Sequence, residues 1–417
     1  MVKYTGMKKT WHIALAVFLA AFALYTISAE LIQHTDTPRV AYFDELADSF
    51  LHGRVCLQEP RSTHDLTYFD GKWYMPFLPL PAFLLLPWVA IAGVENTNTV
   101  AFGVMMGAAN AALVFLLLQS LAKRGWTKLS LNSNLGLVVL FALGSVHWTM
   151  VVQGSVWFLS QICTVTFLLL ALWLAVETGS PLLSGAALGL ALFGRPHVAL
   201  VYPLLLAIGI EHLRARGEHS LRPVARWVVL SGIPIAVSVA LILGYNALRF
   251  DNPLDFGYSK ENVNPQLADD LHTYGQFNLR YVPRNFRVMA LAMPVWDAKN
   301  HLILPDPKGM SLLLTTPALV YLLRARKRSW LVAGAWLALA LLLVPLLTYY
   351  NTGWRQFGYR FSLDFMPVVM VLLATGAGER VDRKFWALIL LGVLVNAWGV
   401  WWFQNPRFFQ PLLKTGQ

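Results

Sequence analysis

The sequence predicts an all-α protein that crosses a membrane about eleven times and forms one integral domain over residues 1–417. Of the 417 residues, 57% are hydrophobic and 13% are charged, and the mean hydropathy is +0.53. These values lie outside the range of ordinary soluble domains. Apolar runs of about 18 residues or more recur along the chain, and each could cross roughly 30 Å of hydrocarbon. The runs do not alternate as barrel strands do, so helices are the expected spanning form.

The basic residues predict how these helices are oriented. Lys and Arg number 33 against 22 Asp and Glu, and many of them gather in short junctions between apolar runs. Such junctions face the cytoplasm in membrane proteins, so the cationic excess indicates orientation and not nucleic-acid binding. The junctions contain Lys3, Lys8 and Lys9; Lys123, Arg124 and Lys128; Arg214, Arg216, Arg222 and Arg226; Arg324, Arg326, Lys327 and Arg328; Arg380, Arg383 and Lys384.

Two long polar segments have a different charge balance and are expected on the outer side. Residues 34–75 hold seven acidic residues against four Lys and Arg, and residues 249–308 hold seven of each. We assign 34–99 to a first outer loop and 249–308 to a second outer loop. The first apolar run has the basic start of a signal peptide but lacks a small-x-small cleavage site, so we expect a retained helix.

The expected spans follow from these junctions, with the N-terminus inside and the C-terminus outside. They cover residues 13–33, 100–121, 132–151, 155–177, 181–194, 197–212, 226–248, 309–323, 329–348, 361–378 and 384–402.

One further apolar run, 77–94, does not fit this alternation of inside and outside, because a span there would move Lys123, Arg124 and Lys128 to the outer face. Its three prolines argue against an ordinary spanning helix, so we expect a re-entrant or juxtamembrane helix at the outer surface. In the alternative solution 77–94 spans the membrane and 181–212 forms one long helix, which would place Arg195 near mid-membrane. Because Pro196 and Pro203 would interrupt that long helix, we favour two separate helices over 181–194 and 197–212.

Several classes of site have no support in the sequence. Cys56 and Cys163 are the only cysteines, one in a polar loop and one in an apolar run, so neither a disulfide nor a cysteine metal site is expected. No Walker loop, GxGxxG after a strand or HExxH occurs, so nucleotide hydrolysis and zinc proteolysis have no support in the sequence.

The first outer loop carries the candidate catalytic acids Asp44, Glu45, Asp48 and Asp65. If 42–52 is helical, Asp44 and Asp48 lie one turn apart on one face and repel each other unless a cation lies between them. A metal ion, an arginine or a substrate could supply that cation. The alternative interpretation is a solvated acidic surface.

Cationic and aromatic candidates come from later segments. Arg195 and His197 lie in a tight connection between two short helices, where an ionisable residue indicates function or, alternatively, an arginine that snorkels to lipid phosphates. Arg360 lies four residues before Asp364, so this pair could neutralise itself. The candidate phosphate-binding residues are Lys72, Arg195, His197, Arg284, Arg355 and Arg360, and the candidate pocket residues are Tyr74, Tyr258, Trp354, Tyr359 and Asp364.

Under the favoured topology all these clusters fall on the outer face, as an outward-facing catalytic cavity requires. An acidic base would activate an acceptor hydroxyl, arginines would hold an anionic leaving group, and aromatic residues would line a sugar or isoprenoid site. Guanidinium groups are suited to phosphate, and a lipid-embedded phosphate donor would explain a site at the membrane surface.

The order of these features resembles the GT-C glycosyltransferases. The resemblance rests on the first helix, the acidic loop with Asp44-Glu45, the segment Gly71-Lys72-Trp73-Tyr74-Met75-Pro76-Phe77-Leu78-Pro79-Leu80-Pro81, the later Gly194-Arg195-Pro196, and the outer loop after the seventh span. Within the superfamily the chain is most similar to the protein O-mannosyltransferase and aminoarabinose-transferase branch.

The resemblance implies an inverting transfer of a sugar from a polyprenyl-phosphate donor to a glycan, lipid or protein acceptor. The site would lie on the outer face of a bacterial inner membrane, with Asp44 as general base and Glu45 beside it. Asp48 and Asp65 compete for the base role. Prolines 76, 79 and 81 stand where related enzymes can carry a phosphate-binding cation, so Lys72 or Arg195 would have to compensate. Some members need a divalent metal ion, which no residue here specifies.

Two rival functions remain open at this point. In a transporter or lipid flippase the polar clusters would line a permeation route, although carriers usually place ionisable groups near the midplane and often show repeated halves. A non-catalytic scaffold would not need a convergent polar face.

Overall fold

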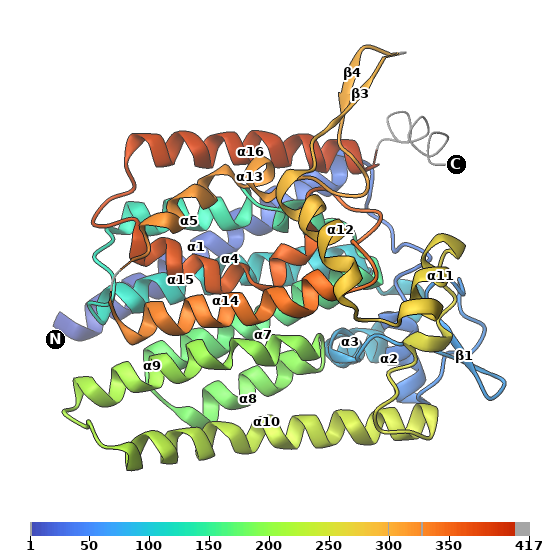
Figure 1. Ribbon diagram of the computed structural model, residues 1–417, viewed down its shortest axis with the longest axis horizontal. Coiled ribbons are helices and arrows are strands. Elements are labelled where there is room, and N and C mark those ends of the chain that lie inside the picture. Colours follow the sequence, from blue (N-terminus) through green and yellow to red (C-terminus); the bar gives the residue numbers. More distant parts are fainter. Residues whose placement is uncertain (1, 299, 327, 405–417) are drawn as a thin grey trace.

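The computed structural model describes residues 2–298, 300–326 and 328–404. Most of these residues form helices that run side by side as one bundle (Figure 1). Seven of the described helices are long and apolar enough to cross a membrane. These are Lys8–Leu31 within α1 (Val2–Leu31), α4 (Thr99–Lys123), α7 (Val156–Thr178), the continuous stretch of η2 (Pro196–Val201) and α9 (Tyr202–Ala215), α10 (Leu221–Phe250), α14 (Trp330–Thr348), and Arg383–Phe403 within α16 (Arg383–Gln404).

The prediction of a helical membrane protein is therefore confirmed, whereas the count of eleven spans is not. The remaining expected spans are shorter or broken. They correspond to α5 (Leu131–Ala142) with α6 (His147–Val151), to α8 (Pro181–Leu192), to α13 (Leu312–Thr315) with the 3-10 helix η6 (Pro317–Arg324), and to η7 (Arg360–Asp364) with α15 (Met366–Gly376). The break between α13 and η6 falls at Pro317, which has no N–H to continue the helical hydrogen bonds.

The run expected to be re-entrant or juxtamembrane forms α3 (Leu80–Ala92), which packs against α2 (Phe43–Leu51) at the polar end of the bundle (Figure 1). Its 13 residues extend only about 20 Å at 1.5 Å per residue, which is less than the hydrocarbon thickness. The backbone N–H of Leu80 donates to the carbonyl of Phe193 at 2.9 Å, so α3 is anchored to the end of α8. The placement of α3 relative to the membrane stays a prediction.

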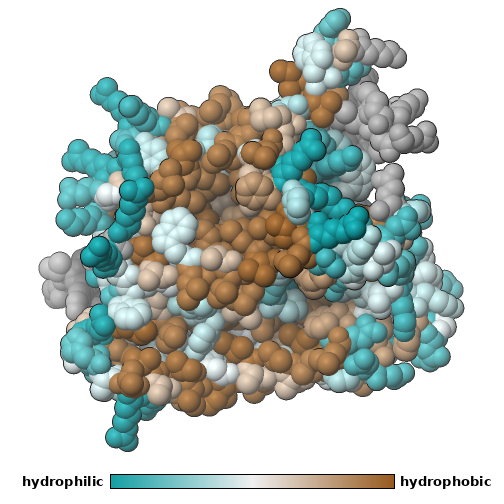
Figure 2. Space-filling view, in the orientation of Figure 1, coloured by the Kyte–Doolittle hydropathy of each residue, from teal (hydrophilic) through white to brown (hydrophobic). Residues whose placement is uncertain are grey.

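The two ends of the bundle differ in charge. The junctions rich in Lys and Arg lie at the end where the N-terminus is found, and the two long polar segments lie at the other end (Figure 1). In the space-filling view, hydrophilic residues gather at both ends and an apolar band lies between them (Figure 2). Ion pairs from Arg324 to Asp382 at 3.1 Å and from Lys128 to Glu379 at 3.6 Å link neighbouring basic junctions.

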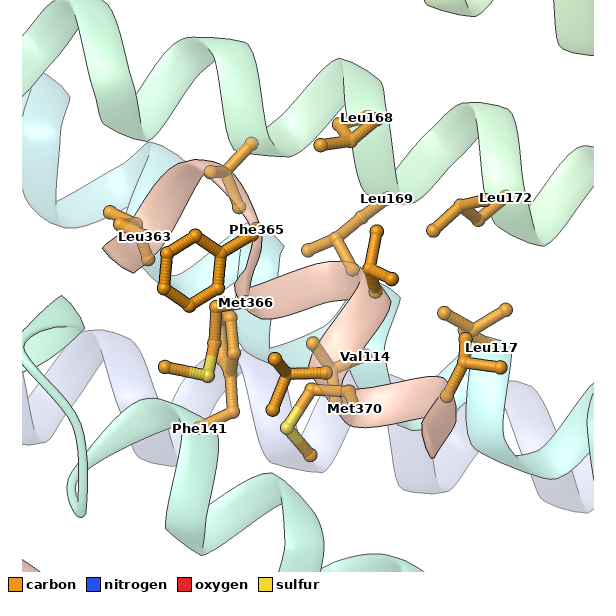
Figure 3. Packing of buried hydrophobic residues seen from close by; sticks show 14 of the residues in the cluster. Val114, Leu117, Phe141, Leu168, Leu169, Leu172, Leu363, Phe365, Met366 and Met370 are labelled. Atoms are coloured by element: carbon orange, nitrogen blue, oxygen red, sulfur yellow. The ribbon is translucent and has the colours of Figure 1, made fainter. Parts of the chain in front are cut away.

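The core surrounds α15, which is apolar on every side and buried from Met366 to Ala374. Figure 3 shows Met366 and Met370 among leucines of α7, Val114 and Leu117 of α4, and Phe141 of α5. Glycines allow close helix contacts elsewhere. A Cβ atom at Gly185 would lie 2.2 Å from the Ser231 carbonyl oxygen, which explains how closely α8 approaches α10.

The two outer segments join to form one cap. Asn262 donates its backbone N–H to the carbonyl of Leu66 at 2.8 Å, and the Thr67 hydroxyl donates to the carbonyl of Gly257 at 2.9 Å. Two short antiparallel hairpins in the cap were not expected from the all-α prediction. The cap consists of β1 (Thr67–Phe69) paired with β2 (Lys72–Tyr74), η1 (Val94–Asn96), η3 (Tyr258–Lys260), α11 (Pro265–Tyr274), η4 (Leu279–Tyr281), α12 (Val282–Phe286), the π-helical η5 (Arg287–Leu291), and β3 (Val295–Asp297) paired with β4 (Leu302–Leu304).

Candidate active site

A cavity of about 280 Å³ lies between the cap and the bundle. Its lining combines both outer segments with the ends of α7, η2, α14 and η7, which are far apart in the sequence. Five of the side chains predicted from the sequence line it, namely Asp65, Arg195, His197, Tyr258 and Arg360. The cavity thus brings an acid, two guanidinium groups and aromatic residues together.

The cationic part of the lining is built around the buried carboxylate of Asp364. The Arg195 Nε lies 3.0 Å from Asp364 Oδ2, and His197 Nε2 lies 3.1 Å from the same oxygen. The Gln161 amide donates to Asp364 Oδ1 at 3.0 Å. Asp364 therefore pairs with Arg195 and His197, and not with Arg360 as the four-residue spacing had allowed.

Arg360 is held beside this network without an ion pair of its own among the described residues. Its backbone N–H donates to the Gln356 side chain at 2.8 Å, and its guanidinium lies over the ring of Phe361 at 5.0 Å. The side chain is only 5% exposed, and its Nε has no hydrogen-bond partner. Burial, together with the positive charge of Arg195, lowers the pKa of Arg360 to about 10. An anion in the cavity would relieve this unfavourable charge.

Asp65 lies on a loop that precedes β1. The indole N–H of Trp157 donates to Asp65 Oδ2 at 2.9 Å, and His64 Nε2 lies 3.6 Å from Asp65 Oδ1. Burial raises the pKa of Asp65, while His64, the Trp157 hydrogen bond and the charge of Arg360 oppose that rise. The carboxylate can therefore ionise but remains a stronger base than an exposed aspartate.

A second acid lining the cavity, Glu261, was not predicted from the sequence. Its Oε2 accepts a hydrogen bond from the Tyr350 hydroxyl at 3.2 Å. Burial raises the pKa of Glu261 well above its usual range, and the negative charge of Asp65 raises it further. No motif surrounds Glu261 in the sequence, so only the pairing of the two outer segments identifies it.

Asp44 and Glu45 lie in α2, outside the described lining of the cavity. The Arg61 guanidinium pairs with both carboxylates. The sequence left open whether a metal ion, an arginine or a substrate lies between Asp44 and Asp48, and in the structure an arginine pairs with Asp44 and Glu45 instead. The described residues contain no group of three His, Cys, Asp or Glu side chains that could hold a metal ion. Burial raises the pKa of Asp44, and Arg61 opposes that rise.

The other predicted acid, Asp48, is partly exposed on α2, 3.6 Å from His52 and 3.8 Å from Arg54. It lies outside the described lining of the cavity. The segment is helical as expected, so Asp44 and Asp48 lie one turn apart, but Asp44 is fully buried and Asp48 is not. Their cationic partners are also different.

The remaining predicted residues surround the cavity or lie away from it. Lys72 is exposed on β2, and Tyr74 packs against Phe250 at 5.5 Å. Arg284 pairs with Asp270 and donates to the Tyr350 carbonyl. Arg355 donates to the Phe403 carbonyl, Trp354 is half-buried, and the buried Tyr359 hydroxyl donates to the Leu346 carbonyl at 3.3 Å.

Comparisons with known proteins found similar solved structures. No family model matches the sequence, and no curated protein matches it. The structure is similar to the crystal structure of ArnT from Cupriavidus metallidurans bound to undecaprenyl phosphate, with 12% sequence identity and a TM-score of 0.48. The match covers 94% of this chain and 63% of ArnT, so this chain spans less than two thirds of the length of that protein.

Proposed function

We propose that this protein is a membrane glycosyltransferase. It transfers a sugar from a polyprenyl-phosphate-linked donor to an acceptor hydroxyl on the outer side of the membrane. The observation that carries the proposal is Arg360, a buried guanidinium without an ion pair among the described residues, beside Arg195 in a cavity that also contains Asp65.

The arginines account for binding of the donor phosphate. Asp364 supplies one negative charge for Arg195 and His197, and Arg360 adds a further positive charge. Planar guanidinium groups bind phosphate oxygens with paired hydrogen bonds. Because negative charge grows on the phosphate as the sugar leaves, fixed cations stabilise the transition state more than the ground state.

Asp65 is the proposed general base among the acids that the sequence left open. Its carboxylate lines the cavity, whereas Asp44 and Glu45 are paired with Arg61. The acceptor O–H proton moves to Asp65 while the acceptor oxygen forms the new bond to the anomeric carbon. The bond from that carbon to the phosphate oxygen breaks, and its electron pair leaves with the polyprenyl phosphate, so the configuration inverts. A raised pKa suits this proton transfer.

The apolar lining of the cavity fits a lipid-linked donor. Pro345 and Leu346, at the end of the apolar helix α14, line the cavity together with the exposed Phe277. An isoprenoid chain could therefore approach along apolar surface while its phosphate reaches the arginines. A carrier would usually place such charges near mid-membrane, but this cavity adjoins the cap at one end of the bundle.

The test combines binding and turnover in purified protein. Native mass spectrometry with undecaprenyl phosphate measures binding, and a panel of undecaprenyl-phosphate-linked sugars in proteoliposomes measures release of the lipid phosphate. We expect Asp65→Asn to bind undecaprenyl phosphate as the wild type does and to lose turnover. Asp48→Asn is the matched control, with the same change at an acid outside the cavity, and should retain turnover.

Two results would contradict parts of the proposal. Full turnover by Asp65→Asn, with loss in Asp44→Asn, would move the base to Asp44. Absence of undecaprenyl phosphate binding by the folded wild type would remove the proposed reaction. The same turnover assay with and without EDTA tests whether a divalent metal ion takes part.

A further inference from the structure

The β3–β4 hairpin extends from the side of the bundle near the end of α16 (Figure 1). Trp296 pairs with Ile303, and the flanking pairs are Val295 with Leu304 and Asp297 with Leu302. Because side chains alternate between the two faces of a strand, Trp296 and Ile303 share one face. The flanking pairs share the other, where Leu304 is buried.

The face formed by Trp296 and Ile303 is apolar and uncovered within the described chain. Trp296 is 57% exposed and Ile303 is 60% exposed. Leu291 and Met293, which lead into β3, are 64% and 63% exposed. Single exposed apolar residues are normal, but four large ones gathered at one projecting element indicate a surface that contacts another phase or partner.

The position of the hairpin indicates a lipid surface as that partner. The hairpin projects from the cap at the level where α16 ends (Figure 1). In the space-filling view, apolar atoms at its base continue toward the apolar band of the bundle (Figure 2). Exposed Arg287 and Lys308 flank the hairpin. Tryptophan is enriched at both membrane–water interfaces, where the long side chains of lysine and arginine can reach the polar headgroups.

We propose that the β3–β4 hairpin lies in the interfacial layer of the outer leaflet, with Trp296 and Ile303 inserted among the lipids. Amphipathic helices at this interface bury their apolar face about 5–10 Å into the boundary between headgroups and acyl chains, and we expect a similar depth for the hairpin. The inference does not rest on the proposed reaction, because the exposed face and its position are independent of the cavity.

The root of the hairpin connects this lipid contact with the cavity. The Gln356 amide donates to the Lys308 carbonyl at 2.8 Å, and its backbone N–H donates to the Pro307 carbonyl at 3.1 Å. The same Gln356 side chain accepts the backbone N–H of Arg360 at 2.8 Å. A hairpin held by lipid would therefore fix the chain that supports Arg360.

Spin labelling in liposomes tests the proposal on the full chain. A label at Ile303→Cys, in a Cys56→Ser and Cys163→Ala background, is compared with a label at Leu302→Cys on the opposite face of the hairpin. We expect collisions with oxygen to exceed collisions with a water-soluble nickel chelate at 303, and the ratio to be several-fold lower at 302. Equal nickel accessibility at both positions would overturn the proposal. Dipolar broadening at 303 that disappears on dilution with unlabelled protein would overturn it in favour of a second copy.

A second measurement needs no cysteine substitution. Fluorescence quenching by phospholipids brominated near the headgroup is compared between the wild type and Trp296→Phe. The fluorescence of Trp296 is the emission of the wild type minus that of Trp296→Phe. We expect the brominated lipids to quench this difference signal. A difference signal that these lipids leave unchanged, while a water-soluble quencher reduces it, would overturn the proposal.

Discussion

Replacing Arg360 by methionine should stabilise the ligand-free protein and remove its stabilisation by undecaprenyl phosphate. Methionine retains much of the length and apolar volume of arginine but not its charge. Arg360 has no ion pair among the described residues, so the substitution breaks no ion pair and removes only the longer-range attraction of Arg360 to Asp65 and Asp364. The change therefore tests the cost of burying this cation in the ligand-free protein.

The size of this cost follows from the pKa of Arg360. Folding lowers it from 12.5 to about 10, and at about 1.4 kcal/mol per unit the charged form is disfavoured by about 3 kcal/mol in the folded state. For a base with a depressed folded-state pKa, this penalty is present in full below about pH 10. Methionine loses the cation–π contacts with Phe158 and Phe361, each about 0.5–1 kcal/mol. The net gain is about 1–2 kcal/mol.

Thermal unfolding of the purified protein measures both the stability of the ligand-free variant and its stabilisation by undecaprenyl phosphate. The fraction of protein that remains monodisperse after heating is recorded at each temperature. The ligand-free variant should unfold about 1–4 °C above the wild type. Undecaprenyl phosphate at about 100 times its Kd should stabilise the wild type by about 2.7 kcal/mol and leave Arg360→Met unchanged.

Arg249→Met provides a control at another buried arginine. Arg249 donates to the Met75 carbonyl and to Asn246, so its loss leaves buried acceptors unpaired and costs about 1–3 kcal/mol, while the ligand shift remains. If Arg360→Met were destabilised to the same extent and kept its ligand shift, the reasoning about an unpaired cation would be refuted.

Three further outcomes are expected. Trp157→Phe removes a hydrogen bond to the charged form of Asp65, which is worth about 1.5–3 kcal/mol. In a plot of kcat/KM against pH, the acidic limb should therefore move up by about one to two pH units. An acidic limb that does not move would exclude Asp65 as the base. Asp364→Asn leaves Arg195 without its carboxylate partner and should lower the unfolding free energy by about 3–5 kcal/mol. Undecaprenyl phosphate should stabilise this variant more than it stabilises the wild type. Equal stabilisation of the two proteins by undecaprenyl phosphate would contradict the prediction. A cysteine at Lys128 should react with an impermeant reagent only from the cytoplasmic side, and labelling from outside would reverse the topology.

Hydropathy and charge were enough to predict a helical membrane protein with its basic junctions at one end, but not the number of long helices. A hydropathy window counts apolar residues and contains no information about backbone hydrogen bonds. The segment 309–323 is apolar enough for a span, yet it breaks at Pro317 into α13 and a 3-10 helix. The short helix α15 shows a second reason: its residues are apolar because other helices bury them, and not because they face lipid.

The candidate site was predictable where a residue lies at a visible chain break. Arg195 stands in a Gly-Arg-Pro turn between two apolar helices, and Arg360 stands just before one, so both were expected at a helix end. The partners of Asp44 and Asp364 were not predictable, because Arg61 and Arg195 reach them through tertiary packing. Spacing along a helix gives only the neighbours on the same helix.

The pairing of the buried charges separates structural roles from binding roles. Asp44 and Glu45 are paired with Arg61, and Asp364 is paired with Arg195, so each of these groups offsets its desolvation within the protein. Arg360 is buried in the same region, and although Asp65 and Asp364 attract its charge, neither forms an ion pair with it among the described residues. A buried charge that no internal partner neutralises lowers stability, and an anionic ligand removes that loss on binding. The site should therefore favour a donor whose negative charge lies next to Arg360 over a neutral lipid of the same length.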